Sequence, residues 1–245
     1  MRKLLISTAI WILGAAANAA AAPRIAVVID DFGLTYKKNV PDEEWYAVKW
    51  PVTYAVMPAS PKTVESAKRT KETGHELIIH FPFDPFLSLK LPKDKVDPAD
   101  LAEVEKLLDK AFSQIPDAVG LNNHRSYRGT MNRPMMAAFM ERLKKRNVYF
   151  LDSHVSPKSV AFEEASRAGI PAAKNWIFLE EPKHYSKEFA AKMLRRCAAR
   201  AKKSGSCLVI GHHYFHGTFD ALVEEVPKLQ AEGFEFVFAS ALLER

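Results

Sequence analysis

Two adjacent carboxylates stand at the end of an apolar run near the start of the chain. Asp30 and Asp31 follow the β-branched stretch 27–29 and come shortly before Gly33. Continuous apolar runs are typical of strands buried on both faces of a parallel sheet, and chemistry in α/β folds gathers at the carboxyl ends of such strands. Because successive strand residues point to opposite faces, both carboxylates reach one pocket only if the backbone bends, and Gly33 permits a bend. Two carboxylates held so close would share a proton or bind a cation, whereas the alternative is a helix N-cap aspartate beside a solvated one.

The pattern of an apolar run followed by polar side chains recurs four more times. The polar groups are His80, the triplets 122–124 and 152–154, and the triplet 211–213. Because the carboxyl ends of parallel strands in a barrel meet on one rim, these carboxylates and imidazoles would lie together. Two histidines, one carboxylate and an open position make up a hydrolytic zinc site, although other divalent ions accept the same ligands.

Strand-like and helix-like segments alternate along the whole chain. Strands are expected up to residue 31, at 52–57, 77–79, 118–121 and 148–151, within 172–179, and at 207–210 and 234–238. Helices are expected at 61–73, 98–114, 134–146, 157–168, 185–203 and 219–231. This alternation is typical of parallel βα units and predicts an α/β fold. Seven or eight units in one modest domain favour a closed or nearly closed barrel, with an open doubly wound sheet as the alternative.

The first residues of the chain are typical of a secretory signal peptide. A basic start, Arg2 and Lys3, precedes the apolar stretch 4–16 and an A-x-A-like cleavage site at 17–19. The apolar stretch is too short for a comfortable membrane span, and an uncleaved anchor is the alternative. We therefore expect residues 1–22 to be a signal peptide. Residues 23–245 would then be a single catalytic domain with no membrane span, exported to the periplasm or secreted.

Charge and cysteine content narrow the possible partners. Without Arg2 and Lys3, 33 basic residues stand against 29 acidic ones, a net charge of +4. The chain has no basic stripe interleaved with aromatic residues, so nucleic acid is not an expected partner. The mild positive charge is compatible with weak attraction to anionic envelope polymers. Cys197 and Cys207 lack the C-x-x-C spacing of metal or redox sites, and a disulfide between them stays open because it requires Cα atoms within about 7 Å.

The motifs in their order resemble the divergent polysaccharide deacetylases, a branch related to the NodB-type carbohydrate esterases. The resemblance runs from Arg24 to Leu242 and depends on the stretches 28–33, 74–77, 80–82, 120–124, 150–153 and 210–212. It implies a deformed (β/α) barrel of about seven parallel strands. It also implies a divalent metal cofactor, zinc above others, and removal of N-acetyl groups from an envelope or extracellular polysaccharide.

The resemblance also implies the metal ligands and the catalytic base. Asp30 matches the base and Asp31 a metal ligand. Typical members supply two further histidines four residues apart. The first matches His80, but Asp84 occupies the second position. His124, at the end of the next strand, would replace the missing histidine, with Asp84 as the fallback ligand.

Further roles carry over at other strand ends. His212 matches the general acid that protonates the leaving amine, and Asp152 would orient or charge it. Asn123, Arg125 and Asp84 are candidates for contact with the substrate. Small residues often follow the histidine of the Asn-Asn-His motif in this branch, so Arg125 would narrow the groove or bind an anionic group.

Two other functions remain open at this point. The missing second histidine and the arginine-rich insertion 125–128 are also compatible with a catalytically weak or inactive protein that binds envelope glycan. A metal-dependent hydrolase of another amide or ester is the second alternative. Metal content and acetate release from N-acetylglucosamine oligomers would separate the first alternative from a deacetylase, and a wider substrate panel would test the second.

Overall fold

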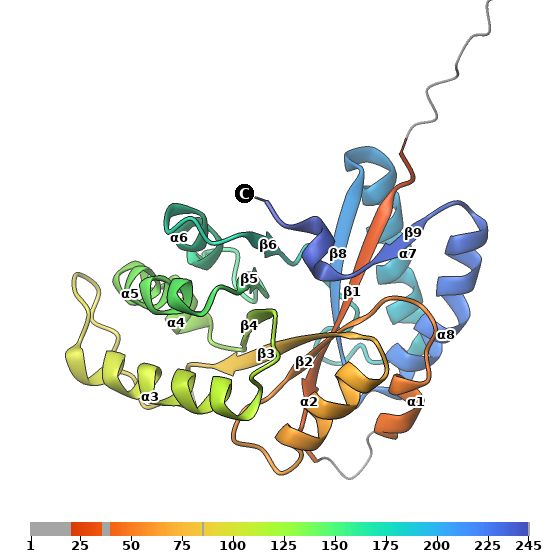
Figure 1. The fold of residues 1–245 in the computed structure, drawn as a ribbon. Coiled ribbons are helices and arrows are strands. Elements are labelled where there is room, and N and C mark those ends of the chain that lie inside the picture. The colour runs from red at the N-terminus through yellow and green to blue at the C-terminus, as the bar shows by residue number, and fades with distance from the viewer. Residues whose placement is uncertain (1–20, 36–39, 85, 245) are drawn as a thin grey trace, which may run out of the picture.

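The computed structural model describes residues 21–35, 40–84 and 86–244. Residues 1–20 of the expected signal peptide lie outside this part of the chain. The described residues form one sheet of nine strands with helices packed around it (Figure 1). The strands are β1 (Arg24–Phe32), β2 (Thr53–Val56), β3 (Glu76–Pro82), β4 (Gly120–His124), β5 (Tyr149–Asp152), β6 (Ala172–Lys174), β7 (Ile177–Phe178), β8 (Ser206–His212) and β9 (Glu235–Val237).

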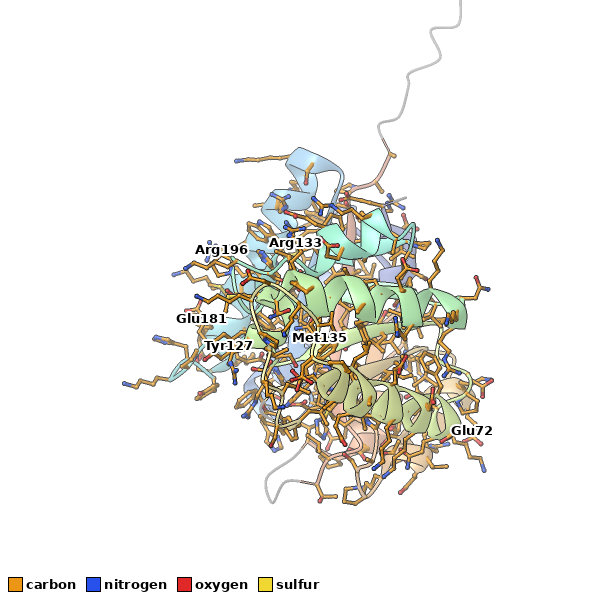
Figure 2. All side chains as sticks on the ribbon, turned by 90° about the vertical axis from the view of Figure 1, so that its left-hand side faces the viewer. Glu72, Tyr127, Arg133, Met135, Glu181 and Arg196 are labelled. Carbon is orange, nitrogen blue, oxygen red and sulfur yellow. A yellow bond between two sulfur atoms is a disulfide. The ribbon has the colours of Figure 1, made fainter. Side chains whose placement is uncertain are left out.

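The helices follow the strands along the chain, as the alternating pattern predicts. They are α1 (Asp42–Tyr46), α2 (Thr63–Glu72), α3 (Pro98–Gln114), α4 (Tyr127–Met131), α5 (Arg133–Leu143), α6 (Ala161–Arg167), α7 (Lys187–Ser204) and α8 (His216–Ala231), with 3-10 turns η1 (Lys144–Arg146) and η2 (Ala239–Leu242). Helices α3 to α6 lie along one half of the sheet and α7 and α8 along the other (Figure 1). Figure 2 looks onto the first half, where α3 and α5 run side by side and carry many of their side chains outward. Within the described residues, no helix combines the length and apolar character needed to cross a bilayer.

The strands are parallel and form a barrel that is not fully closed. Their order is β6-β5-β4-β3-β2-β1-β8-β7. The short strand β9 pairs with residues 24–26 at the start of β1, and β2 pairs with residues 28–32 at its end. Within the described residues, β6 and β7 are the two ends of this order and do not pair with each other, so the barrel is open between them. Glu244 instead forms an antiparallel bridge with Ala172 on the outer edge of β6. The expected α/β barrel is confirmed. It has nine strands, compared with the eight segments expected along the sequence and the roughly seven implied by the resemblance, because the stretch 172–179 contains two short strands in place of one.

Two apolar cores lie on the two faces of the sheet. Residues such as Ala26, Val28 and Ile78 fill the inside of the barrel, whereas Val27 and Ile79 pack outward against the helices. Because side chains alternate along a strand, the inner set fixes which strand-end residues point into the barrel.

The helix that follows β3 shows how local sequence sets an element's start. The carboxylate of Asp97 accepts a hydrogen bond from the backbone N–H of Ala99 at 2.9 Å, and Pro98 occupies the first helical position, which is a preferred start for a helix. This helix matches its expected bounds. The short helices α1 and α4 were not expected, because each has only five residues and no apolar repeat long enough to predict it.

A disulfide bond joins Cys197 of α7 to Cys207 of β8, with their Cα atoms 5.6 Å apart. Both residues are buried in the outer core. The sequence left this bond open, and the packing of α7 directly on β8 settles it. The bond therefore ties this helix to the strand that ends at His212.

Candidate functional site

The end of β1 brings two carboxylates to one side of the sheet. Alternation along the strand places Asp30 on the inner face with Ala26 and Val28, and would place Asp31 on the outer face. Asp31 instead has φ of 72°, and the pairing of β1 with β2 shifts register between Ile29 and Phe32. The bend expected at Gly33 therefore begins at Asp31, and it turns this carboxylate inward as well. A left-handed conformation costs a non-glycine residue about 1–2 kcal/mol, and such strain often occurs at functional sites.

Three potential ligand atoms meet at this point. Oδ1 of Asp31 lies 2.9 Å from Nδ1 of His124 and 3.2 Å from Nε2 of His80. The two imidazole nitrogens are themselves 2.8 Å apart. All three side chains are buried, and they come from the ends of β1, β3 and β4. The expected grouping of Asp31, His80 and His124 is therefore present in the structure.

Asn122 fixes the orientation of His80 and of Asp30. Its amide nitrogen donates to Oδ1 of Asp30 at 2.8 Å and to Oγ of Ser153 at 3.2 Å. Its amide oxygen consequently faces Nδ1 of His80, 2.7 Å away, and accepts the hydrogen on that nitrogen. The proton on Nδ1 leaves Nε2 of His80 with a lone pair directed at Asp31 and His124, which is the tautomer that a metal ligand needs.

The donor set fits a divalent metal. Oδ1 of Asp31 is buried and has no hydrogen-bond partner among the described residues. Burial raises the pKa of Asp31, but the imidazoles of His124 and His80 outweigh that effect and hold the pKa well below its usual range. Burial also lowers the pKa of His124, which favours the neutral, metal-binding imidazole. Two imidazoles and one carboxylate are the protein ligands of many hydrolytic zinc sites.

Asp30 lies beside this cluster without being part of it. Its Oδ2 is 3.7 Å from Nε2 of His80, and its other oxygen is held by Asn122. Burial is the main cause that raises the pKa of Asp30. A carboxylate with a raised pKa is a stronger base, so Asp30 is suited to accept a proton next to the metal site.

His212 approaches the same cavity from the end of β8, on the other side of β1. Oε2 of Glu180 lies 3.0 Å from Nδ1 of His212, and Oε1 accepts the backbone N–H of His212 at 3.1 Å and the hydroxyl of Thr218. Burial lowers the pKa of His212, but the hydrogen bond and charge of Glu180 outweigh it and raise the pKa to about 9. Phe178 stacks on the imidazole with ring centroids 6.2 Å apart. His212 is therefore a protonated imidazole at neutral pH, held by a buried carboxylate.

The expected partner of His212 was Asp152, and the structure corrects this assignment. Leu151 belongs to the inner core, so Asp152 points outward from β5. Its carboxylate accepts hydrogen bonds from the N–H of His154 at 2.7 Å and the hydroxyl of Ser159 at 2.7 Å, and it shapes the loop before α6. Glu180 takes the role that the sequence gave to Asp152. The acid follows the short strand β7, and applying the recurring strand-end pattern there would have found it.

Asp84 is also removed from the chemistry. Its Oδ1 accepts the backbone N–H of Gly129 at 2.7 Å, and its side chain is buried against α4. Asp84 belongs neither to the group of potential ligands formed by Asp31, His80 and His124 nor to the lining of the cavity that these residues share. It anchors α4, which begins three residues after His124.

Asn123 and Arg125 lie in the lining of a cavity of about 180 Å³ that also contains the catalytic candidates. Asn123 holds the loop, since its amide oxygen accepts the N–H of Ser153 at 2.9 Å and its amide nitrogen donates to the carbonyl of Arg125 at 3.2 Å. The side chain of Arg125 is exposed at the mouth. Tyr214, which follows β8, completes the wall near His212 and was not expected from the sequence.

Comparison with known sequences identifies relatives over nearly the whole described chain. A family model described as a divergent polysaccharide deacetylase matches residues 27–243. The chain is 32% identical over 192 residues to the uncharacterized protein YibQ of Escherichia coli (strain K12), a match covering 78% of this chain and 59% of that protein. The chain thus spans less than two thirds of the length of this relative.

Solved structures share the fold at low sequence identity. An uncharacterized protein from Agrobacterium tumefaciens C58 superposes with a TM-score of 0.79 at 20% identity, covering 91% of this chain and 90% of that one. The catalytic domain of a peptidoglycan N-acetylglucosamine deacetylase from Eubacterium rectale gives 0.53 at 15% identity, covering 89% and 90%. A CE4 family pseudoenzyme from Bacillus anthracis gives 0.55 at 13% identity, covering 91% and 66%. The fold thus occurs both in a deacetylase and in a pseudoenzyme.

Proposed function

Because this chain belongs to the divergent polysaccharide deacetylase family, we propose that it is a metal-dependent hydrolase that removes N-acetyl groups from an envelope or extracellular polysaccharide. One observation carries the proposal. Asp30 and the group formed by Asp31, His80 and His124 share a single cavity with His212, which Glu180 holds. A base, a metal site and a protonated acid are the three parts that amide hydrolysis at neutral pH requires.

The residues divide the reaction between two sides of the cavity. A divalent metal held by Asp31, His80 and His124 would polarise the acetyl carbonyl and lower the pKa of the attacking water. Asp30 accepts a proton from that water through Oδ2, the oxygen that Asn122 leaves free. His212 donates its proton to the amine nitrogen as the C–N bond breaks, and acetate and the free amine are released.

Asn122 and Glu180 act on this reaction through other side chains. Asn122 bonds Asp30 and His80 at once, so it sets the base and one ligand relative to each other. Glu180 stabilises the charged form of His212. Neither group needs to touch the substrate, and we assign both as positioning residues.

A catalytically weak glycan-binding protein remains the alternative, and the pseudoenzyme of the same fold keeps it relevant. The sequence favours this alternative mainly because Asp84 stands where typical family members have a second histidine. His124 supplies an imidazole nitrogen 2.9 Å from Asp31, so the ligand count is restored from another strand, which favours the enzyme.

The test combines metal content with acetate release. We expect the purified protein to bind about one zinc ion and to release acetate from N-acetylglucosamine oligomers. His124→Ala should lose both, and Asp84→Ala is the matched control that should keep the metal. Failure of the zinc-loaded wild type to release acetate from any N-acetylated glycan would favour the binding protein. Metal loss in Asp84→Ala but not in His124→Ala would refute the ligand assignment.

We also propose that the protein is exported. The basic and apolar start of the chain motivates this, and the disulfide between Cys197 and Cys207 supports it, because such bonds persist in oxidising compartments. N-terminal sequencing of the protein from its native host should begin between Ala20 and Pro23. A chain that retains Met1 in the cytoplasm would contradict the proposal.

A further inference from the structure

Arg125 occupies an unusual place at the mouth of the cavity. It directly follows the ligand His124, and among the residues that line the cavity it is the one lysine or arginine. The lining acids Asp30, Asp31 and Glu180 all have other partners or roles in the site. A fixed positive charge next to a divalent metal repels the metal, so the position of Arg125 does not serve the metal site itself.

The guanidinium of Arg125 has no acidic partner within the described chain. Six other described arginines pair with carboxylates, namely Arg69, Arg133, Arg142, Arg146, Arg167 and Arg195, whereas Arg24, Arg128, Arg196 and Arg200 do not, and none of these four lines the cavity. For Arg125, the described residues offer neither an ion pair nor a side-chain hydrogen bond, and the side chain is exposed. Its five N–H donors are therefore available to a molecule that enters the cavity.

The backbone that carries this side chain is held in a defined, strained conformation. Arg125 and Ser126 have φ of 49° and 62°, two successive left-handed residues that are not glycine. Ser126 is fully buried, and its hydroxyl accepts the N–H of Phe83 at 2.9 Å while its carbonyl accepts the N–H of Thr130 at 2.9 Å. Asn123 holds the carbonyl of Arg125. The loop is thus built to present position 125 at the mouth.

We propose that Arg125 binds a carboxylate carried by the substrate, so that the glycan deacetylated here is acidic. This inference rests on the proposed function and deepens it. The planar guanidinium matches a carboxylate with two parallel hydrogen bonds, and Arg125 lines the same cavity of about 180 Å³ as the candidate ligands and base. The carboxylate could belong to a uronic acid or to the lactyl ether of a muramic acid, and the experiment separates these sources.

The experiment compares zinc-loaded wild type with Arg125→Met and with Arg128→Met. Arg128 is an exposed arginine of α4, three residues further along the chain, and does not line the cavity, so its variant loses the same charge. Methionine keeps an unbranched aliphatic stem and removes the guanidinium. Binding by calorimetry and kcat/KM for acetate release are measured on three probes: neutral chitotetraose, a hyaluronan tetrasaccharide, and a peptide-free peptidoglycan tetrasaccharide whose N-acetylmuramic acid has a free lactyl carboxylate.

We expect the wild type to prefer at least one acidic probe over chitotetraose. Arg125→Met should reduce that preference about 10–100-fold, the usual worth of a charge-assisted hydrogen-bond pair, and Arg128→Met should leave it within about 3-fold. Raising the salt concentration from 50 to 500 mM should weaken only acidic probes. Equal loss on neutral and acidic probes in Arg125→Met would overturn the inference, as would absence of binding to both acidic probes.

Failure of the carboxylate site and failure of the proposed reaction can be told apart. Calorimetry reports the preference even if no acetate is released, in which case the deacetylase fails and the carboxylate site stands. Acetate release from chitotetraose with no effect of Arg125→Met on selectivity would leave the deacetylase and remove the carboxylate site.

Discussion

The pair formed by Glu180 and His212 sets the alkaline limit of the proposed reaction. His212 must carry a proton to act as an acid, and Glu180, with smaller contributions from Asp31 and Asp30, outweighs burial and raises its pKa from 6.5 to about 9. Glu180→Gln removes the negative charge, but the glutamine keeps one side-chain oxygen that can accept the hydrogen bonds from the Thr218 hydroxyl and the backbone N–H of His212. With burial still opposing the charged imidazole and only Asp31 and Asp30 left to favour it, the pKa should fall well below 9.

The assay is the pH dependence of kcat/KM for acetate release, supported by NMR titration of the imidazole in the metal-free protein. At pH 8 about 90% of His212 is protonated with a pKa near 9, so every unit by which Glu180→Gln lowers the pKa below 8 should cost about tenfold in rate at that pH. A full return to the ordinary value of 6.5 would cost roughly 30-fold. A bound cation lowers the pKa of His212 in the wild type and in Glu180→Gln alike. The quantity tested is therefore the difference in this pKa between the two proteins. Glu181→Gln, which removes an adjacent exposed charge, is the matched control.

Stability gives a readout that does not depend on activity. Because the folded pKa of His212 lies above its unfolded value, the pair stabilises the folded state fully below pH 6.5, and this stabilisation is lost as the pH rises through about 9. Metal-free wild type should therefore lose stability over this range, and Glu180→Gln should lose less. Coincident alkaline limbs and coincident stability profiles in the two proteins would refute the reasoning.

Three further changes test separate parts of the structure. Asp30→Asn should lower the rate about 10²–10⁴-fold while metal content and the melting transition stay nearly unchanged; an unaffected rate would contradict its role as base. Asp84→Ala should keep the metal but cost about 1–3 kcal/mol of unfolding free energy, measured in urea, because it leaves buried N–H groups of α4 unpaired. Replacing Cys197 and Cys207 by serine should cost about 2–4 kcal/mol, and reductant should bring the wild type to the same midpoint; a wild type indifferent to reductant would show that the bond is not formed.

The position of polar groups at strand ends could be predicted from the sequence alone. Apolar runs followed by polar residues marked the ends of β1, β3, β4 and β8, and parallel strands in a barrel direct such ends to one rim. For this reason the grouping of Asp31, His80 and His124 was predicted correctly although one ligand position of the resembled family holds another residue. Local signals also set α3, because Asp97 and Pro98 act within their own turn.

The direction in which each strand-end residue points was decided only by the tertiary structure. Strands buried on both faces show no alternation of polar and apolar residues, so the sequence does not reveal which residues face inward. This is why Asp152 was assigned to His212, whereas it points outward from β5 and Glu180 points inward after β7. The left-handed Asp31 has the same origin, since its conformation depends on the register between β1 and β2.

Contacts between distant segments were equally beyond the sequence. Asp84 looked like a ligand because of its spacing from His80, but α4 folds back and takes its carboxylate through backbone N–H groups. The disulfide depended on the distance between a helix and the next strand, which no spacing rule fixes. Composition and periodicity are local properties and determine the elements and their ends. The direction in which each side chain points, and the contacts between segments distant in the sequence, depend on the tertiary packing of the whole chain.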